Sequence, residues 1–210
     1  MILSHSKKFI FIHIYKVAGT SIRKALQPYA DHTKKDFSLI KNIQFMLGGR
    51  FHFLSRLSMD HLKAKEIKSL INTEVFNSSF KFSFVRNPWD WQVSLYHFML
   101  QDENHHQHKL INKMKSFEEY IEWRVKYSVE SQKSFLYDEN NNKLVDFVGK
   151  FENLQEDFNE ILSKIGVKEI QLPVLNTSIH RYYKEYYNDY TRDLVEKAFK
   201  EDIELFQYEF

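Results

Sequence analysis

Residues 9–26 combine a short apolar run, a tight polar turn and a helical pattern. Residues 9–14 are β-branched or aromatic apart from His13, which is typical of a strand buried on both faces, as in a parallel sheet. Further on, Ile22, Ala25 and Leu26 recur at helical spacing. The stretch therefore predicts a buried strand that runs through a tight loop into a helix.

The loop between these two elements contains Lys16, Gly19, Thr20 and Ser21. A helix start presents backbone N–H groups and a partial positive charge, which suits a phosphate. Gly19 lets the backbone approach an anion, and Lys16 adds a full positive charge. The loop is not a Walker A motif, because its lysine precedes the glycine instead of following it. Taken alone, it is equally compatible with an ordinary strand-turn-helix that has a surface lysine.

A second strand-loop-helix unit follows at residues 80–99. The apolar run Phe80–Val85 predicts a strand, and Pro88 suits the start of the next helix. Strands that alternate with helices indicate βαβ units. The predicted fold class is therefore α/β, with a P-loop-like parallel sheet flanked by helices.

Arg86 and Ser94 are the candidate anion-binding residues of this second unit. Arginine offers a planar fork of donors that matches phosphate, and serine adds a hydroxyl donor. Two helical turns bring the Ser94 hydroxyl back over the loop that carries Arg86. The alternative is that Arg86 pairs with Asp90 as a salt bridge at the helix start.

The rest of the chain has weaker patterns. Residues 102–115 contain three histidines, for which a solvated loop is favoured over a metal site, because the pattern does not mark the carboxylate or second cluster that such a site needs. The other expected elements are a helix from His61 with Asp60 as N-cap, a helix from Ser116 to about Tyr127, a strand over 144–151, a helix from Asn153 to Gly166 and a helix over 191–206.

Composition narrows the classes of protein to which the chain can belong. The 210 residues are enough for one domain with a sizeable core, and the residues are 43% hydrophobic and 28% charged. Without cysteine, disulfides and thiolate chemistry are excluded. A net charge of +2 does not favour nucleic acid as a partner, so any anion site has to be local. With no apolar run long enough to span a membrane, we expect a cytoplasmic protein, or a soluble catalytic domain cut from a membrane-anchored one.

Together, the two units resemble the two-part nucleotide site of sulfotransferases. Residues 151–157 and 206–210 add to this likeness, which is strongest to the carbohydrate-type group called sulfotransferase family 2 and spans nearly the whole chain. The resemblance implies one domain over 1–210 that binds 3′-phosphoadenosine 5′-phosphosulfate (PAPS). Its first loop would hold the 5′-phosphosulfate, and the second unit would hold the 3′-phosphate. The residues implied in cofactor binding are Lys16, Ala18, Gly19, Thr20, Ser21, Arg86 and Ser94.

The resemblance also implies transfer of a sulfuryl group to a carbohydrate hydroxyl. Such a transfer needs positive charge at the leaving oxygen, supplied by Lys16, and a base near the acceptor. His61 is the predicted base, with His52 as an alternative and Asp60 as a residue that could orient or replace it.

Two later residues have alternative interpretations. Glu152 could orient the site or cap the following helix. Arg181, in a loop rich in tyrosine, could close over the adenine or the 3′-phosphate, or belong to a packing edge.

Two other functions compete with this one. A kinase-like phosphotransferase would need an acidic residue at a strand end to hold Mg²⁺. Val85 is followed by Arg86 and Asn87 instead, and no metal is expected. A non-catalytic module for polyanions or glycans would keep the basic residues without needing the paired strand-loop-helix units.

Overall fold

The computed structural model describes residues 1–31, 61–173, 175 and 181–210. Within them a four-stranded sheet has the order β1 (Ile2–Ser4), β2 (Phe9–Phe11), β3 (Phe80–Val85) and β4 (Phe147–Lys150). β2, β3 and β4 are parallel, with Phe11 opposite Phe82 and Phe82 opposite Phe147. β1 pairs antiparallel with β2 and was not predicted. The parallel sheet expected from the two strand-loop-helix units is thus present, with an antiparallel strand added at one edge.

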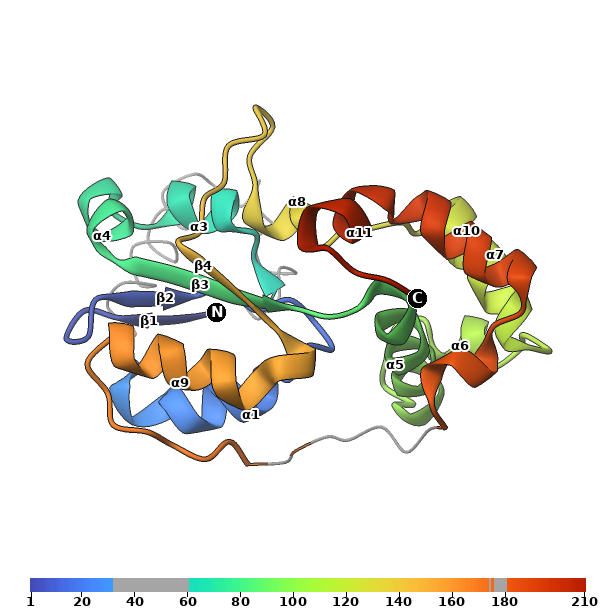
Figure 1. Ribbon diagram of the computed structural model, residues 1–210, viewed down its shortest axis with the longest axis horizontal. Helices are drawn as coiled ribbons and strands as arrows, with labels where there is room; N and C mark the ends of the chain where they lie inside the picture. Colours follow the sequence, from blue (N-terminus) through green and yellow to red (C-terminus); the bar gives the residue numbers. More distant parts are fainter. Residues whose placement is uncertain (32–60, 174, 176–180) are drawn as a thin grey trace, which may run out of the picture.

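Helices cover both faces of this sheet (Figure 1). α1 (Gly19–Leu26) and α9 (Leu154–Lys164) lie along one face. α3 (Ala64–Leu70) and α4 (Thr73–Ser78) lie along the other. This is the mixed α/β architecture that the sequence predicts.

A second group of helices lies beyond the carboxyl end of β3 (Figure 1). It contains α5 (Pro88–Gln101), α6 (His108–Ile111), α7 (Phe117–Tyr127), α10 (Asp189–Ala198) and the 3₁₀ turn η4 (Tyr183–Tyr186). α8 (Lys133–Leu136) and α11 (Lys200–Phe206) connect this group to the sheet. Two further 3₁₀ turns are η1 (Gln27–Tyr29) and η3 (Phe151–Asn153).

Local sequence explains where several helices begin. Pro88 occupies the first turn of α5, and the Asn87 side chain accepts a hydrogen bond from the Trp89 N–H. Ser116 caps α7 through the Glu119 N–H, as its capping-box pattern predicts. These caps fix the points at which the loops turn into helices.

The core of the sheet is aromatic. Phe9, Phe11, Phe82 and Phe84 are completely buried, and the Phe11 and Phe82 rings stack with their centroids 5.3 Å apart. The apolar run predicted as one strand remains buried through Ile14, although the strand itself ends at Phe11. This buried run is what fixes the position of the loop that follows.

Several predicted boundaries were wrong. The strand expected over 144–151 is limited to β4. The last predicted helix is two helices that meet at Phe199, whose buried ring lies edge-to-face on Trp91. The break coincides with the packing of Phe199 against α5, a contact that helical periodicity does not encode.

Two predicted helix caps also need revision. The N-cap of α3 is Lys63, while Asp60 lies outside the described residues. Asn153 occupies the N-cap position of α9, as predicted, but its side chain makes no capping hydrogen bond. No described helix is long and apolar enough to cross a membrane.

Candidate active site

The loop between β2 and α1 has an unusual backbone. Lys16 and Ala18 both have left-handed conformations, with φ of 62° and 61°. Such conformations cost free energy in residues other than glycine and persist where neighbouring groups hold them. The Trp91 indole donates to the Tyr15 carbonyl over 2.8 Å, and Arg86 Nη1 donates to the Lys16 carbonyl over 3.1 Å. The second strand-loop-helix unit therefore holds the first in shape.

α1 begins directly after this turn. Its N-cap residue is Ala18, whose side chain makes no capping hydrogen bond to the first turn. The first N–H groups of the helix are therefore not satisfied by their own cap, which suits an anion ligand.

Gly19 is required at the helix start for a reason that the sequence did not reveal. A Cβ added to this residue would lie 1.7 Å from Nε2 of the buried His13 imidazole. The ring of His13 thus packs directly against the Gly19 backbone, and any side chain there would displace it. The glycine allows the imidazole and the turn before α1 to lie in contact.

The Lys16 ammonium group is partly buried. Its Nζ lies 4.3 Å from the centroid of the Phe98 ring. Burial, followed by the nearby Arg86 guanidinium, lowers the pKa of Lys16 from 10.5 to about 8. An anion bound nearby would raise this pKa again, so Lys16 is electrostatically prepared for a negatively charged ligand.

Arg86 lies beside this lysine, where the predicted anion site and the predicted salt bridge coincide. Its Nε donates to Asp90 Oδ2 over 2.7 Å, and its guanidinium carbon lies 4.1 Å from the Phe151 ring centroid. Nη1 contacts the Lys16 carbonyl, while Nη2 has no hydrogen-bond partner among the described residues. The two predicted roles of Arg86, anion binding and a salt bridge with Asp90, are therefore compatible. Asp90 orients the guanidinium from one edge, and the other edge faces the loop.

Two residues that sequence reasoning missed hold the Arg86 backbone. The Gln132 amide accepts from the Arg86 N–H over 2.9 Å and donates to the Arg86 carbonyl over 2.8 Å. The buried Asp202 carboxylate accepts from the N–H groups of Gln132 and Lys133. Burial raises the pKa of Asp202 from 3.8 to about 6. No local pattern marks either residue.

Glu152 orients the same loop from the opposite side. Its carboxylate accepts from the Asn87 N–H over 2.7 Å and from the Tyr208 hydroxyl over 3.0 Å. The Asn87 amide in turn donates to the Glu209 carbonyl. Of the two roles considered for Glu152, the structure thus shows the orienting one, and it involves the C-terminal residues 206–210.

His61 lies against the first loop. Its Nδ1 is 3.1 Å from the His13 carbonyl oxygen, and its ring centroid is 4.5 Å from that of His13. A carbonyl can only accept, so Nδ1 carries the proton and Nε2 carries the lone pair of a neutral ring. This tautomer is the one a base acting through Nε2 needs. His52 and Asp60, its alternatives, lie outside the described residues.

The other candidate residues differ in exposure. Ser21 and Ser94 are buried, whereas Thr20 is exposed at the first turn of α1. Arg181 is exposed, lies 3.8 Å from Glu185 and stacks over Tyr186. It precedes η4, which packs against α5, the helix that carries Ser94.

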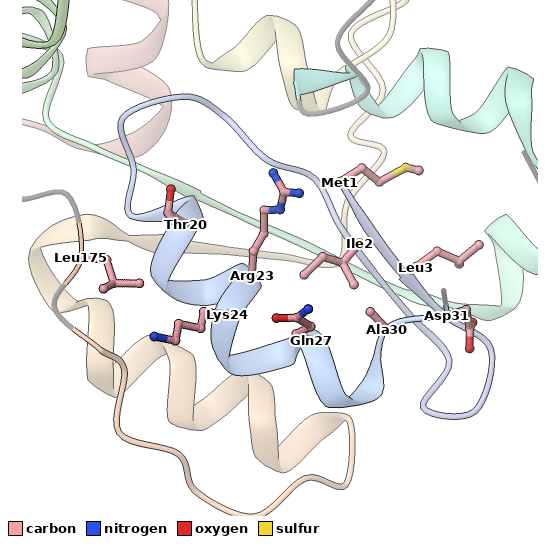
Figure 2. Close-up of a pocket in the computed structure, with 10 residues that line it drawn as sticks. All are labelled: Met1, Ile2, Leu3, Thr20, Arg23, Lys24, Gln27, Ala30, Asp31 and Leu175. Atoms are coloured by element: carbon pink, nitrogen blue, oxygen red, sulfur yellow. The ribbon is translucent and has the colours of Figure 1, made fainter. Parts of the chain in front are cut away.

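A pocket of about 560 Å³ begins beside Thr20 and follows α1 (Figure 2). Arg23 and Lys24 on α1 and Gln27 on η1 contribute polar lining, and Leu175 reaches the pocket from the late part of the chain. Residues of β1 complete its apolar wall. Its volume is in the range of small-molecule pockets.

No group of three or more histidine, aspartate or glutamate side chains that could hold an ion occurs among the residues that the structure describes. His105 and His106 lie with ring centroids 4.5 Å apart between α5 and α6.

The parallel strands β2 and β3 lead through adjacent loops into α1 and α5, which defines an α/β protein with a P-loop-like arrangement. A model of the sulfotransferase family matches residues 1–209, and the chain therefore belongs to this family. It is a sulfotransferase, an enzyme that transfers a sulfuryl group.

Two individual proteins show the extent of the likeness. The crystal structure of mouse sulfotransferase SULT7A1, complexed with PAP, matches 96% of this chain and 86% of its own, with a TM-score of 0.56 and 14% identity. At that identity the match shows the fold. An uncharacterized protein of Archaeoglobus fulgidus is 29% identical over 121 residues, which are 57% of this chain and 94% of that protein.

Proposed function

We propose that residues 1–210 form one catalytic domain that transfers the sulfuryl group of PAPS to a carbohydrate hydroxyl. The observation that carries this proposal is the contact between Arg86 Nη1 and the Lys16 carbonyl. It places the two anion-binding loops side by side, as a ligand with phosphates on both the 3′ and 5′ positions of one ribose requires. The mouse sulfotransferase of the same fold was crystallised with PAP.

In this proposal the first loop and the α1 N-terminus hold the 5′-phosphosulfate. Its residues are Lys16, Ala18, Gly19, Thr20 and Ser21. Arg86, through Nη2, and Ser94 hold the 3′-phosphate, and Arg181, which precedes η4, also belongs to the proposed cofactor-binding residues. The donor set consists of guanidinium, ammonium, hydroxyl and backbone N–H groups, all of which suit phosphate oxygens.

The adenosine part would occupy the pocket beside Thr20. This pocket adjoins the loop and offers both an apolar wall and hydrogen-bonding side chains, as a purine nucleoside needs (Figure 2). Arg23 supplies a planar guanidinium that can stack on a base.

His61 acts as the base in the proposed reaction. Nε2 takes the proton of the acceptor hydroxyl while its oxygen forms a bond to sulfur and the bond from sulfur to the phosphate oxygen breaks. Lys16 stabilises the charge that develops on the departing phosphate oxygen. The products are a sulfate ester and 3′,5′-adenosine bisphosphate.

The identity of the acceptor as a carbohydrate is the most specific part of the proposal. It is supported by the likeness of the sequence to the carbohydrate-type group of sulfotransferases.

The first test concerns the nucleotide. We expect 3′,5′-adenosine bisphosphate to bind without metal and to raise the unfolding free energy by about 2.7 kcal/mol at 100 times its Kd. Mg-ATP should bind much more weakly, because its charges lie along one triphosphate chain. Calorimetric titrations of both ligands check this, and tighter binding of Mg-ATP would contradict the proposal in favour of a phosphotransferase.

A second test uses the lowered pKa of Lys16, about 8. The ammonium form binds the anion, so bisphosphate affinity should be nearly constant between about pH 7, above the second pKa of about 6 of the ligand's phosphates, and pH 8. Above it the free protein loses the proton that the complex keeps, so affinity should fall by up to about tenfold per pH unit. Calorimetry at pH 7.5 and pH 9.5 measures this decline.

The matched control for that test is Lys16→Arg. A guanidinium stays protonated at both pH values, so the variant should lose most of the decline. An equally steep decline in Lys16→Arg would show that another group titrates.

A further inference from the structure

A buried polar network joins the helical group to the anion-binding loop. Arg124 on α7 is 4% exposed. Its Nη2 donates to the Tyr15 hydroxyl over 2.9 Å, its Nε donates to Gln92 Oε1 over 3.1 Å, and its Nη1 donates to Ser128 Oγ over 2.8 Å. The guanidinium thus links α5 and α7 to the residue that precedes Lys16.

This network is a poor source of stability. The hydrogen-bond partners of Arg124 are neutral oxygens, and the nearby Glu130 carboxylate, which also interacts with the Tyr15 hydroxyl, forms its ion pair with Lys63. Burying a cation in this way costs free energy, and an apolar side chain of similar size would avoid that cost. The network is better explained by what it holds in place.

What it holds is the Tyr15 side chain. The Tyr15 ring stacks on Trp91, with centroids 4.8 Å apart and an interplanar angle of 26°. Its edge meets the His61 ring at 90°, with centroids 5.9 Å apart. Lys16, the next residue, has the left-handed backbone described above. Tyr15 therefore contacts the proposed base through its ring and directly precedes the proposed cation in the chain.

We infer that Tyr15 is a positioning residue for the sulfuryl-transfer step, and that Arg124 acts on the site through the Tyr15 hydroxyl. The inference rests on the proposed function, since it takes His61 as the base and Lys16 as the cation. Loss of the hydroxyl frees the ring to shift on Trp91, and His61 and Lys16 shift too. A misplacement of about 1 Å can lower a rate by about a hundredfold while binding changes little.

The test compares Tyr15→Phe with Tyr120→Phe. The Tyr120 hydroxyl donates to the same Gln92 oxygen over 3.3 Å, but its ring packs on Phe117 and Trp123 instead of His61. Each variant removes one hydroxyl from the network of Arg124 and Gln92, but only Tyr15 contacts His61. Melting temperature and calorimetric affinity for 3′,5′-adenosine bisphosphate are measured for each.

The rate is measured in a single turnover of PAPS with water as acceptor. Water forms a bond to sulfur and gives up a proton, the bond from sulfur to the phosphate oxygen breaks, and the products are sulfate and the bisphosphate. We expect Tyr15→Phe to be at least about tenfold slower with affinity within about twofold of the wild type, and Tyr120→Phe to keep the wild-type rate. Equal rates in the two variants would overturn the inference.

A measurement independent of turnover accompanies it. The NMR shifts of the His61 ring protons, assigned with His61→Gln, depend on the ring currents of Tyr15 and Trp91. Phenylalanine keeps a ring, so a changed shift in Tyr15→Phe reports that the ring has moved, and an unchanged shift overturns the inference. If the wild type fails to bind the bisphosphate, the proposed function fails, and the NMR comparison still decides whether Arg124 fixes Tyr15 against His61.

Discussion

Replacing His61 with alanine is expected to lower the rate of sulfuryl transfer by about 10² to 10⁴ while bisphosphate affinity stays nearly unchanged. The reason is geometric, because the base touches the acceptor hydroxyl and not the nucleotide. The structure adds that Nδ1 is directed at the His13 carbonyl, which leaves Nε2 as the basic atom of the neutral ring. Initial rates with a panel of sugars and polysaccharides, together with calorimetry, measure the two quantities.

His108→Ala is the matched control for this variant. His108 Nδ1 also lies within hydrogen-bond distance of a backbone carbonyl, that of Met99, at 2.9 Å. Loss of such a contact alone should therefore cost similar stability in both variants, and only His61→Ala should lose turnover. If His61→Ala keeps near-normal turnover while His52→Ala or Asp60→Ala abolishes it, the base is one of those residues.

Lys16→Ala should behave differently from His61→Ala. Lys16 meets negative charge both in the bound cofactor and, more strongly, in the transition state, so affinity and turnover should fall together. This difference separates the cation from the base within one set of measurements.

Replacing Arg86 with alanine is expected to weaken bisphosphate binding by about 2 to 4 kcal/mol, as for a lost charge-assisted fork. The variant also leaves Asp90 without its partner, so its unfolding free energy should fall by about 1 to 3 kcal/mol. Calorimetry well below the melting temperature keeps the two effects apart. Ser94→Ala should cost less affinity, about 1 kcal/mol.

Asp90→Asn separates phosphate binding from loop geometry. It removes the negative charge from the same 2.7 Å ion pair, while the amide oxygen can still accept from Arg86 Nε and keep the guanidinium in place. Stability should then fall as in Arg86→Ala, while bisphosphate affinity should stay within about twofold of the wild type. An equal loss of affinity in both variants would mean that Arg86 acts by holding the loop, and would remove it from the cofactor-binding residues.

Local patterns were sufficient to predict the two strand-loop-helix units. The apolar run before Lys16, the glycine at the start of α1 and the proline at the start of α5 each specify structure through neighbouring residues. The α/β class and the choice of Lys16 and Arg86 as candidate residues follow from those units. Patterns of this kind are readable because each depends on a few consecutive side chains.

Element boundaries were less predictable. Residues 2–4 carry too short an apolar run to indicate a strand, and β1 forms because β2 offers it an edge. The break at Phe199 accompanies a ring contact with Trp91, which lies far away in the sequence. Packing overrides local periodicity at both places.

The sequence by itself determined the fold class and the two strand-loop-helix units, because helix and strand periods and turn chemistry are local. Tertiary structure alone decided how the loops are held: Gln132 on the Arg86 backbone, Glu152 on Asn87, and Arg124 on Tyr15. These pairs are separated by 46, 65 and 109 residues. A hydrogen bond across such distances depends on where the folded chain brings its partners, and no spacing in the sequence records that.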